Sequence, residues 1–120
     1  MPPTILHFHD DPEGAHSLDA LLVAAGYGRL ITCGYSRYAV DLIQQIVPDL
    51  VLVDITREPS TSGWRLVEEI ARNPESRGTP IIVCAADSSN PAVADLGCAV
   101  VSKPIVPDDL LQQVAHALGA

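Results

Sequence analysis

A single carboxylate closes the most apolar stretch of this chain. Residues 50–53 form an aliphatic run that follows Pro48-Asp49 and ends at Asp54. The length and β-branched content of the run predict a strand buried on both faces. An ionised carboxylate is costly inside an apolar layer, so we expect Asp54 to face a polar crevice at the end of this strand. The commoner role of such an aspartate is to cap the next turn, and the neighbouring residues decide between the two.

Other charged side chains follow the first and the last apolar stretches. His9-Asp10-Asp11 comes after residues 4–8, and Lys103 comes after residues 99–102. If these strands are parallel, their carboxyl ends meet at one edge of the sheet, where open α/β sheets bind ligands. Converging carboxylates repel one another, and a hard divalent cation relieves that repulsion. The set suits phosphoryl transfer, with a carboxylate as nucleophile and with Mg²⁺ and a lysine holding the phosphoryl oxygens.

The strands and helices that would position these groups alternate along the chain. Apolar runs predict five strands, at residues 4–8, 30–33, 50–53, 80–84 and 99–102. A helical pattern follows each strand, and the fourth helix has room only within residues 91–96. Short βαβ connections predict one α/β domain over residues 1–120, with a doubly wound parallel sheet covered by helices on both faces. The second helix is expected to be capped by Ser36 and to bury Ile43 and Val47.

Length and charge narrow the classes of function. A chain of 120 residues with 48% apolar residues is long enough to bury a core, and no apolar run is long enough to span a membrane. The N-terminus lacks the basic and apolar regions of a signal peptide, so we expect a cytoplasmic location. The formal charge of −8, with only seven Lys and Arg, argues against direct binding of nucleic acid and favours proteins or cations as partners.

Several other reactive side chains are predicted to be structural. Cys33, Cys84 and Cys98 lack metal-ligand spacing, and their odd number argues against a disulfide framework. Cys84 ends one predicted strand and Cys98 precedes the next, so they should lie at opposite edges, more than ~10 Å apart, which disfavours redox sensing. His7 lies within the first strand and is expected to be a hydrogen-bonded core histidine. Trp64 is expected to pack near the site.

Five motifs in the same order resemble the receiver domain of two-component response regulators. The resemblance covers nearly the whole chain. Its motifs are residues 5–27 with Asp11-Pro12-Glu13, residues 48–54, Gly63, residues 80–83, and Ser102-Lys103-Pro104. It implies a CheY-like, flavodoxin-like fold with strand order 2-1-3-4-5. It also implies a signalling module rather than an enzyme, with at most self-catalysed phosphotransfer and dephosphorylation.

The resemblance implies a role for each matching residue. Asp54 would accept a phosphoryl group from a histidine kinase or phosphotransfer protein. Asp10 and Asp54, with the backbone carbonyl of Thr56, would bind Mg²⁺. Lys103 would contact the phosphoryl oxygens, and the Lys103–Pro104 bond would be cis. The module would act as a monomer or weak dimer on a downstream protein, without contacting a membrane or nucleic acid.

The chain departs from the family pattern at its site. His9 replaces the first acid, Ala85 replaces the switch Ser or Thr, and Val100 replaces the switch Tyr or Phe. A site that mixes His9 with Asp10 or Asp11 would accept Mn²⁺ or Zn²⁺ more readily than an all-carboxylate site would. His9 could equally be a strand-end residue hydrogen-bonded to Asp54 or Asp11. Without the usual switch side chains, any response to phosphorylation must use other contacts that differ between two states.

Two functions other than a phosphorylated receiver fit parts of this pattern. One is a pseudo-receiver, a protein-interaction adaptor that works without phosphorylation and needs no Mg²⁺. The other is a haloacid-dehalogenase-like phosphohydrolase, which also uses a strand-end Asp and a Lys. That class requires a second Asp two residues after the nucleophile, and Thr56 occupies this position. The leading interpretation is therefore phosphorelay signalling through Asp54.

Overall fold

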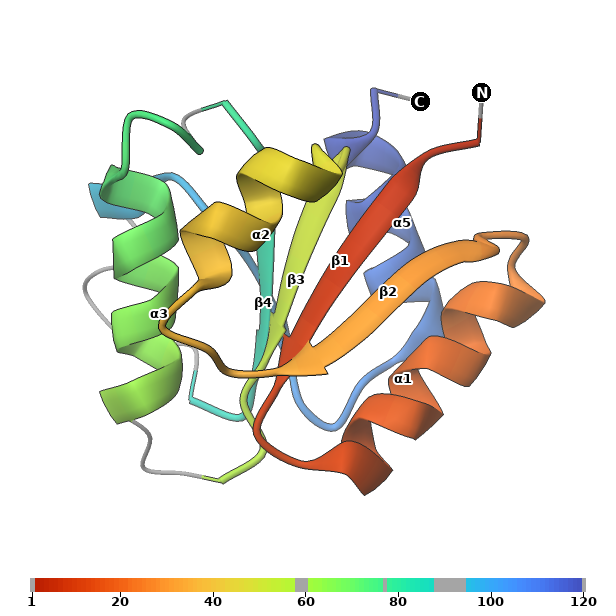
Figure 1. Ribbon diagram of the computed structural model, residues 1–120. Coiled ribbons are helices and arrows are strands. Elements are labelled where there is room, and N and C mark those ends of the chain that lie inside the picture. The colour runs from red at the N-terminus through yellow and green to blue at the C-terminus, as the bar shows by residue number, and fades with distance from the viewer. Residues whose placement is uncertain (1, 58–60, 77, 88–94, 120) are drawn as a thin grey trace.

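The computed structural model describes residues 2–57, 61–76, 78–87 and 95–119 (Figure 1). Strands and helices alternate along the chain. In order they are β1 (Thr4–His9), α1 (Pro12–Ala24), β2 (Arg29–Gly34), α2 (Ala39–Ile46), β3 (Leu50–Asp54), α3 (Thr61–Arg72), β4 (Ile81–Ala85), β5 (Ala99–Ser102) and α5 (Pro107–Ala117). Most of the predicted short fourth helix, within residues 91–96, lies outside the described residues.

The sheet confirms the predicted fold class. Its five strands are parallel and run in the order β2-β1-β3-β4-β5. The order reverses between β1 and β3, and the carboxyl ends of these two strands adjoin there, with His9 in register with Asp54. This reversal is the place where doubly wound sheets bind ligands.

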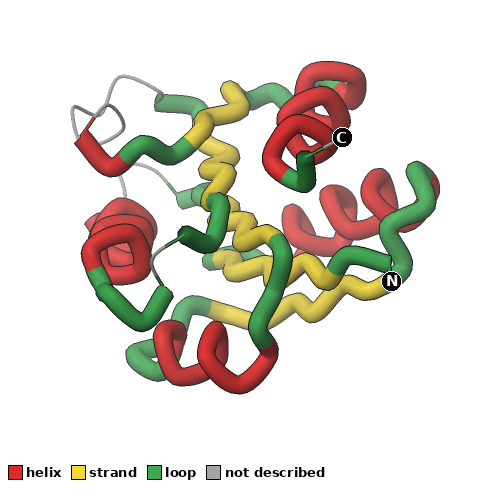
Figure 2. Tube along the Cα trace, turned by 90° about the horizontal axis from the view of Figure 1, so that it is seen from above, coloured by secondary structure: helices red, strands yellow, loops and turns green. Residues whose placement is uncertain are grey.

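Helices cover both faces of the sheet. Figure 2 shows α2 and α3 on one side and α1 with α5 on the other. Alternate residues of β1 supply the two cores: Leu6 and Phe8 pack toward α2 and α3, while Ile5 packs toward α1 and α5. Because both faces are covered, β3 is buried along its whole length, as its aliphatic sequence predicts.

The second helix differs from its prediction at both ends. The Ser36 hydroxyl accepts a hydrogen bond from the Tyr38 backbone N–H (3.0 Å), and α2 begins only at Ala39. Val47 is 73% exposed instead of buried. It has a left-handed conformation with φ 50°, because the chain must turn toward β3 before Pro48, which cannot continue the helix.

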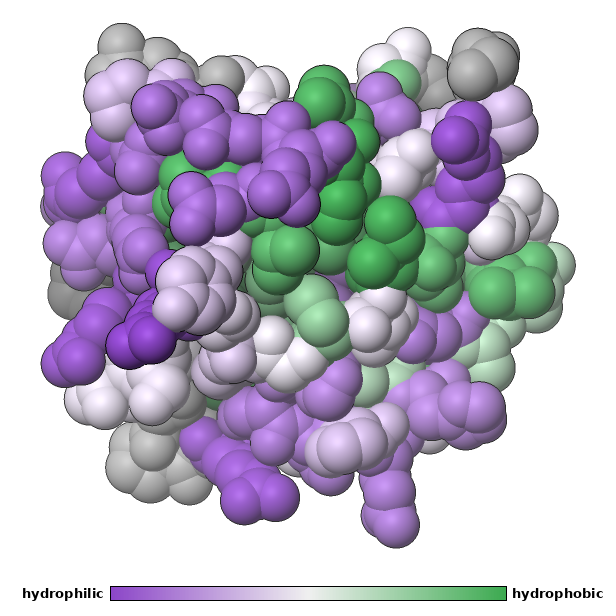
Figure 3. All heavy atoms as spheres, viewed as in Figure 1, coloured by the Kyte–Doolittle hydropathy of each residue, from purple (hydrophilic) through white to green (hydrophobic). Residues whose placement is uncertain are grey.

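Apolar side chains remain visible on the α2 side of the molecule. Figure 3 shows them gathered across the middle of this face, with polar side chains around them. Ile31 on β2 pairs with Leu6, so its side chain projects from the α2 side of the sheet, and it is 41% exposed. Among the described residues, none of the helices is long and apolar enough to cross a membrane.

Candidate functional site

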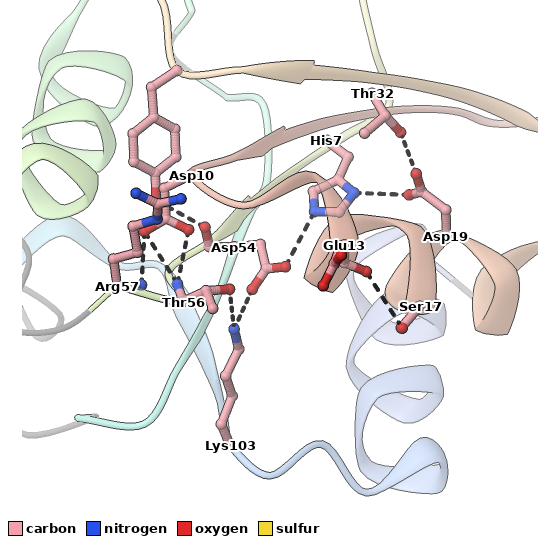
Figure 4. Close-up of polar contacts among 11 residues, drawn as sticks. His7, Asp10, Glu13, Ser17, Asp19, Thr32, Asp54, Thr56, Arg57 and Lys103 are labelled. Atoms are coloured by element: carbon pink, nitrogen blue, oxygen red, sulfur yellow. Dashed lines mark hydrogen bonds and ion pairs between the residues drawn. The ribbon is translucent and has the colours of Figure 1, made fainter.

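Asp54 is the buried end of the central strand. Its side chain is 3% exposed and lies on the α1 and α5 side of the sheet, between β1 and β4 (Figure 4). The Lys103 ammonium lies 2.5 Å from Asp54 Oδ1. The two residues are brought together from β3 and from the end of β5, as the topology of a parallel sheet requires. This buried ion pair is the centre of the candidate site.

Lys103 is held by hydrogen bonds at both its backbone and its side-chain ammonium. Its backbone N–H donates to the Ala85 carbonyl (2.9 Å), which ties the end of β5 to the end of β4. Its Nζ also donates to Thr56 Oγ1 at 3.0 Å. The Lys103–Pro104 peptide bond is cis, as the resemblance implied. A solvated surface lysine would not hold its ammonium against Thr56 and Asp54.

Asp10 binds the loop that follows β3. Its carboxylate accepts hydrogen bonds from the Thr56 backbone N–H (2.9 and 3.2 Å) and from the Arg57 N–H (2.9 Å). Through these bonds, β1 holds the start of that loop beside the phosphoacceptor candidate. The carboxylate of Asp10 therefore points at backbone amides in this structure.

Oxygen atoms of three residues lie close to the position that a Cβ on Gly14 would take. An ideal Cβ on Gly14 would lie 3.2 Å from Thr56 Oγ1, 3.5 Å from Asp11 Oδ2 and 4.0 Å from Asp54 Oδ2. Carboxylate and hydroxyl oxygens are the donors that Mg²⁺ prefers, so the chemistry of this set fits the cation. Among the described residues, no group of three or more His, Cys, Asp and Glu side chains is placed to hold a metal ion.

A pocket opens beside this oxygen set. Its volume is about 170 Å³, and apolar side chains of α1 and of the segment after β5 form its walls above the charged pair. The lining residues are Gly14, Ser17, Leu18, Leu21, Asp54, Lys103 and Ile105. A group that reaches Asp54 can therefore enter between α1 and the segment between β5 and α5.

His9 has neither of its predicted hydrogen bonds. Its Nδ1 is buried without a hydrogen-bond partner among the described residues, and no hydrogen bond joins it to Asp54 or Asp11. Its ring lies edge-on to the ring of His7, with centroids 6.1 Å apart. The two rings meet because the pleat of β1 places residues 7 and 9 on the same face of the sheet.

His7 belongs to the site, which the sequence interpretation missed. It is fully buried, and its Nδ1 lies 2.8 Å from Asp19 Oδ1, so it is the hydrogen-bonded core histidine that was predicted. Its Nε2, however, points at Asp54 Oδ2 from 3.8 Å (Figure 4). A signal was present in the sequence, since Asp19 takes an inward position of α1 among Ala15, Leu18 and Leu22.

Tyr35 is a second residue that the sequence interpretation missed. Its hydroxyl donates to the backbone carbonyl of Asp54 (2.8 Å), and its own N–H donates to the His9 carbonyl (3.1 Å). Burial raises the pKa of Tyr35, and the Asp10 and Asp54 carboxylates raise it further, so the hydroxyl stays protonated. Tyr35 thus joins the β2–α2 connection to the backbone of the candidate phosphoacceptor.

The charges around Asp54 keep it ionised despite its burial. Burial alone raises the pKa of the Asp54 carboxyl, but the nearby His7 ring and Lys103 ammonium lower it by more, so the net shift is downward. A carboxylate is the form that can act as a nucleophile at neutral pH. Ala85 and Val100, which by the resemblance take the positions of the switch side chains, belong to the core on the α2 and α3 side of the sheet: Ala85 is buried and Val100 is partly buried.

Two curated proteins are similar in sequence. A Vibrio cholerae protein named as a cyclic di-GMP phosphodiesterase is 32% identical over 94 residues, which cover 78% of this chain and 20% of that protein. The polar-differentiation response regulator DivK of Brucella anthropi is 28% identical over 99% of this chain and 98% of its own length. The chain thus spans about a fifth of the first relative and nearly all of the second.

Many solved structures are similar in fold, among them the following two. A response regulator from Chloroflexus aurantiacus J-10-fl superposes with a TM-score of 0.82 and is 25% identical, with 100% of both chains covered. The receiver domain of the sensor histidine kinase PA1611 from Pseudomonas aeruginosa PAO1, which has a magnesium ion in its active-site cleft, is 21% identical, with a TM-score of 0.76 and 100% of both chains covered. The response regulator receiver domain family matches residues 5–115, and this chain belongs to that family.

Proposed function

We propose that this receiver domain accepts a phosphoryl group on Asp54 and passes the signal on through protein contacts. The observation that carries the proposal is the buried Asp54–Lys103 pair, 2.5 Å apart, at the floor of a pocket. A structural ion pair would have no need of an open pocket above it. The expected phosphodonor is a histidine kinase or a phosphotransfer protein, in keeping with two-component signalling.

In the proposed step, one carboxylate oxygen of Asp54 attacks the phosphorus of a phosphohistidine on the donor protein. A P–O bond forms as the P–N bond breaks, and the electron pair returns to the imidazole nitrogen. Lys103 neutralises charge on the phosphoryl oxygens from the side of β5. Because Asp54 is nearly dry, its electrostatic interaction with Lys103 is stronger than it would be in water.

The proposed cofactor is Mg²⁺, with Asp10, Asp54 and the backbone carbonyl of Thr56 as its expected ligands. Asp11 is a further candidate, because its Oδ2 lies on the same side of Gly14 as Asp54 Oδ2. When bound, the cation adds positive charge that stabilises the transferring phosphoryl group. The oxygens around Gly14 support this assignment, as does the magnesium ion in the PA1611 receiver domain. His9 replaces an acid and would offer a nitrogen ligand, which Mn²⁺ accepts more readily than Mg²⁺ does. We therefore expect Mn²⁺ to serve as well.

The first experiment measures intact mass after incubation with acetyl phosphate and Mg²⁺. We expect one added phosphoryl group in the wild type and none in Asp54→Asn. Asp41→Asn is the matched control, because Asp41 is an exposed carboxylate on α2 and should not affect phosphorylation. An unmodified wild-type protein would argue against the proposal.

A second experiment uses the single tryptophan as a reporter. Trp64 lies in the first turn of α3 and packs against the core on that side. We expect its fluorescence to change on addition of Mg²⁺ and again with beryllofluoride, and Asp54→Asn should abolish the second change. If neither ligand has an effect and no phosphoryl group is added, the alternative of a phosphorylation-independent adaptor is favoured.

A further inference from the structure

A row of polar side chains leads from the exposed Thr32 to the buried Asp54. It starts on β2, where the Thr32 hydroxyl donates to Asp19 Oδ2 (2.7 Å). Asp19 Oδ1 lies 2.8 Å from His7 Nδ1, and His7 Nε2 lies 3.8 Å from Asp54 Oδ2. Figure 4 shows these four side chains in one row from β2 to the candidate phosphoacceptor.

The strand register puts His7 and Asp54 on the same side of the sheet. His7 pairs with Thr32 on one side and with Leu52 on the other. Asp54 is two residues beyond Leu52, so its side chain projects from the same face of the sheet as that of His7. Asp19 reaches this face from α1, next to the buried Leu18. The row therefore follows from the topology and does not depend on a loop.

Burial of a histidine at this position costs free energy of desolvation unless its ring nitrogens have polar partners. The side chain of His7 is completely buried, and an aliphatic side chain would fill the same strand position without desolvation of a polar group. The hydrogen bond to Asp19 satisfies one ring nitrogen. The other, Nε2, has no hydrogen bond among the described residues and faces Asp54.

The orientation of the Asp54 carboxylate is what such a row can control. Rotation of an aspartate about its last side-chain bond is only loosely restricted, so an unsupported carboxylate turns easily. Lys103 contacts one oxygen of Asp54, and His7 lies beside the other. A nucleophile has to be aligned with the reacting phosphorus, and a misplacement of 1 Å can lower a rate by about a hundredfold.

We propose that His7, held by Asp19 and Thr32, is a positioning residue that sets the orientation of the Asp54 carboxylate for phosphoryl transfer. The kinetic part of this proposal rests on the proposed function of Asp54 as phosphoacceptor. His9 is in register with Asp54 but makes no hydrogen bond to it, so His7 is the residue of β1 that faces this carboxylate. Asp19 and Thr32 act through His7 and contact no reacting group.

Two substitutions of His7 by amide residues test the two ring nitrogens separately. In His7→Gln the terminal amide reaches about as far as Nε2 and can take its place beside Asp54. In His7→Asn it reaches about as far as Nδ1, so it keeps the contact with Asp19 and loses the one with Asp54. Glu68→Gln on the exposed face of α3 is the control, since among the described residues Glu68 pairs with Arg72 alone.

The test measures phosphorylation by acetyl phosphate over a range of donor concentrations. We expect His7→Asn to lower the maximal rate by roughly tenfold or more, with an unchanged half-saturating concentration, because orientation and not binding is lost. His7→Gln should stay close to the wild-type rate. If both variants lose rate equally, in proportion to their loss of thermal stability, or if neither does, His7 is only a packing residue and the proposal is wrong.

A measurement without phosphorylation separates this proposal from the function on which it rests. The carboxyl carbon of Asp54 is observed by NMR in protein labelled at its aspartates, and Asp54→Asn identifies its signal. We expect His7→Asn to shift this signal and to leave that of Asp41 in place. If the wild type is never phosphorylated but the signal moves, the proposed function fails and the positioning role stands. If the signal does not move, the positioning role is overturned.

Discussion

Burial of the Asp54 carboxylate makes its partners decisive. Lys103 is the only lysine of the chain, and it contacts both Asp54 and Thr56. Within the Asp54 ion pair, the lysine side chain is 22% exposed whereas the carboxylate is 3% exposed, so most of the desolvation falls on Asp54. Removal of the Lys103 ammonium would leave the almost fully buried Asp54 carboxylate without its closest positive charge.

Lys103→Met is expected to destabilise the protein. Methionine keeps the apolar stem and removes the charge, and loss of a partner from a buried charged group lowers the free energy of unfolding by about 1–3 kcal/mol. Urea denaturation at neutral pH measures this change. Arg72→Met is the control, because the Arg72–Glu68 pair is largely exposed and should contribute no more than about 0.5 kcal/mol. Equal losses in the two variants would contradict the expectation.

Cys84 is expected to be chemically inert in the folded protein. It is fully buried, and burial together with the Asp54 carboxylate raises the pKa of its thiol to about 12. The thiolate is the reactive form, so almost none is present at neutral pH. Brief treatment with iodoacetamide, followed by peptide mapping, should modify Cys33 and Cys98 before Cys84. Rapid labelling of Cys84 in the native state would contradict this and revive the redox interpretation.

Close packing around the end of β3 connects the site to α3. The hydroxyl of Tyr35 donates to the Asp54 carbonyl from the β2–α2 side, and α3 approaches the same place through Gly63. A Cβ on Gly63 would lie 2.6 Å from Ile55 Cγ1 and 2.9 Å from the Tyr35 hydroxyl oxygen. The element that follows the acceptor loop is therefore held where only a glycine fits.

Gly63→Ala should displace α3 and lower stability. Overpacking of this kind lowers the free energy of unfolding by roughly 1–3 kcal/mol, and it should also change the emission of Trp64, one residue away. Chemical denaturation followed by fluorescence reports both effects. Gly28→Ala is the matched control, since a Cβ there meets nothing within 4 Å. A Gly63→Ala protein as stable as the wild type would refute the packing argument.

The whole molecule carries an excess of negative charge. The formal charge is −8, and part of it converges on the carboxyl edge of the sheet, where Asp10, Asp11 and Asp54 gather. A cation that binds the native site stabilises the fold by mass action, whereas monovalent salt only screens the general repulsion. These two effects are separable by experiment.

Mg²⁺ should raise the thermal midpoint of the wild type more than NaCl at the same ionic strength. At a hundred times the dissociation constant, one bound ion adds about 2.7 kcal/mol to the free energy of unfolding. Asp54→Asn should lose most of the difference between the two salts, because it removes a charged ligand. The same response to both salts in the wild type would argue against a specific site.

The local pattern of residues was sufficient to predict the elements and the edge at which the site lies. Aliphatic runs and helical spacing predict strands and helices because both depend on neighbours along the chain, and a parallel sheet then brings Asp54 and Lys103 together at one end. The place of Val47 was missed, because the turn into β3 outweighs the helical pattern at its last residue. The predicted fourth helix stays a prediction, because residues 91–94 lie outside the described ranges.

Only the tertiary structure decided which side chains meet around Asp54. Three sets of contacts join segments that are distant in sequence. They are the row from Thr32 through Asp19 to His7, the hydrogen bond from the Tyr35 hydroxyl to the Asp54 carbonyl, and the hydrogen bonds from backbone amides to Asp10. Such contacts depend on strand register and side-chain rotamers, which local sequence does not specify. The sequence by itself determined that a carboxylate and a lysine share one edge, and the fold determined that a buried histidine stands behind that carboxylate.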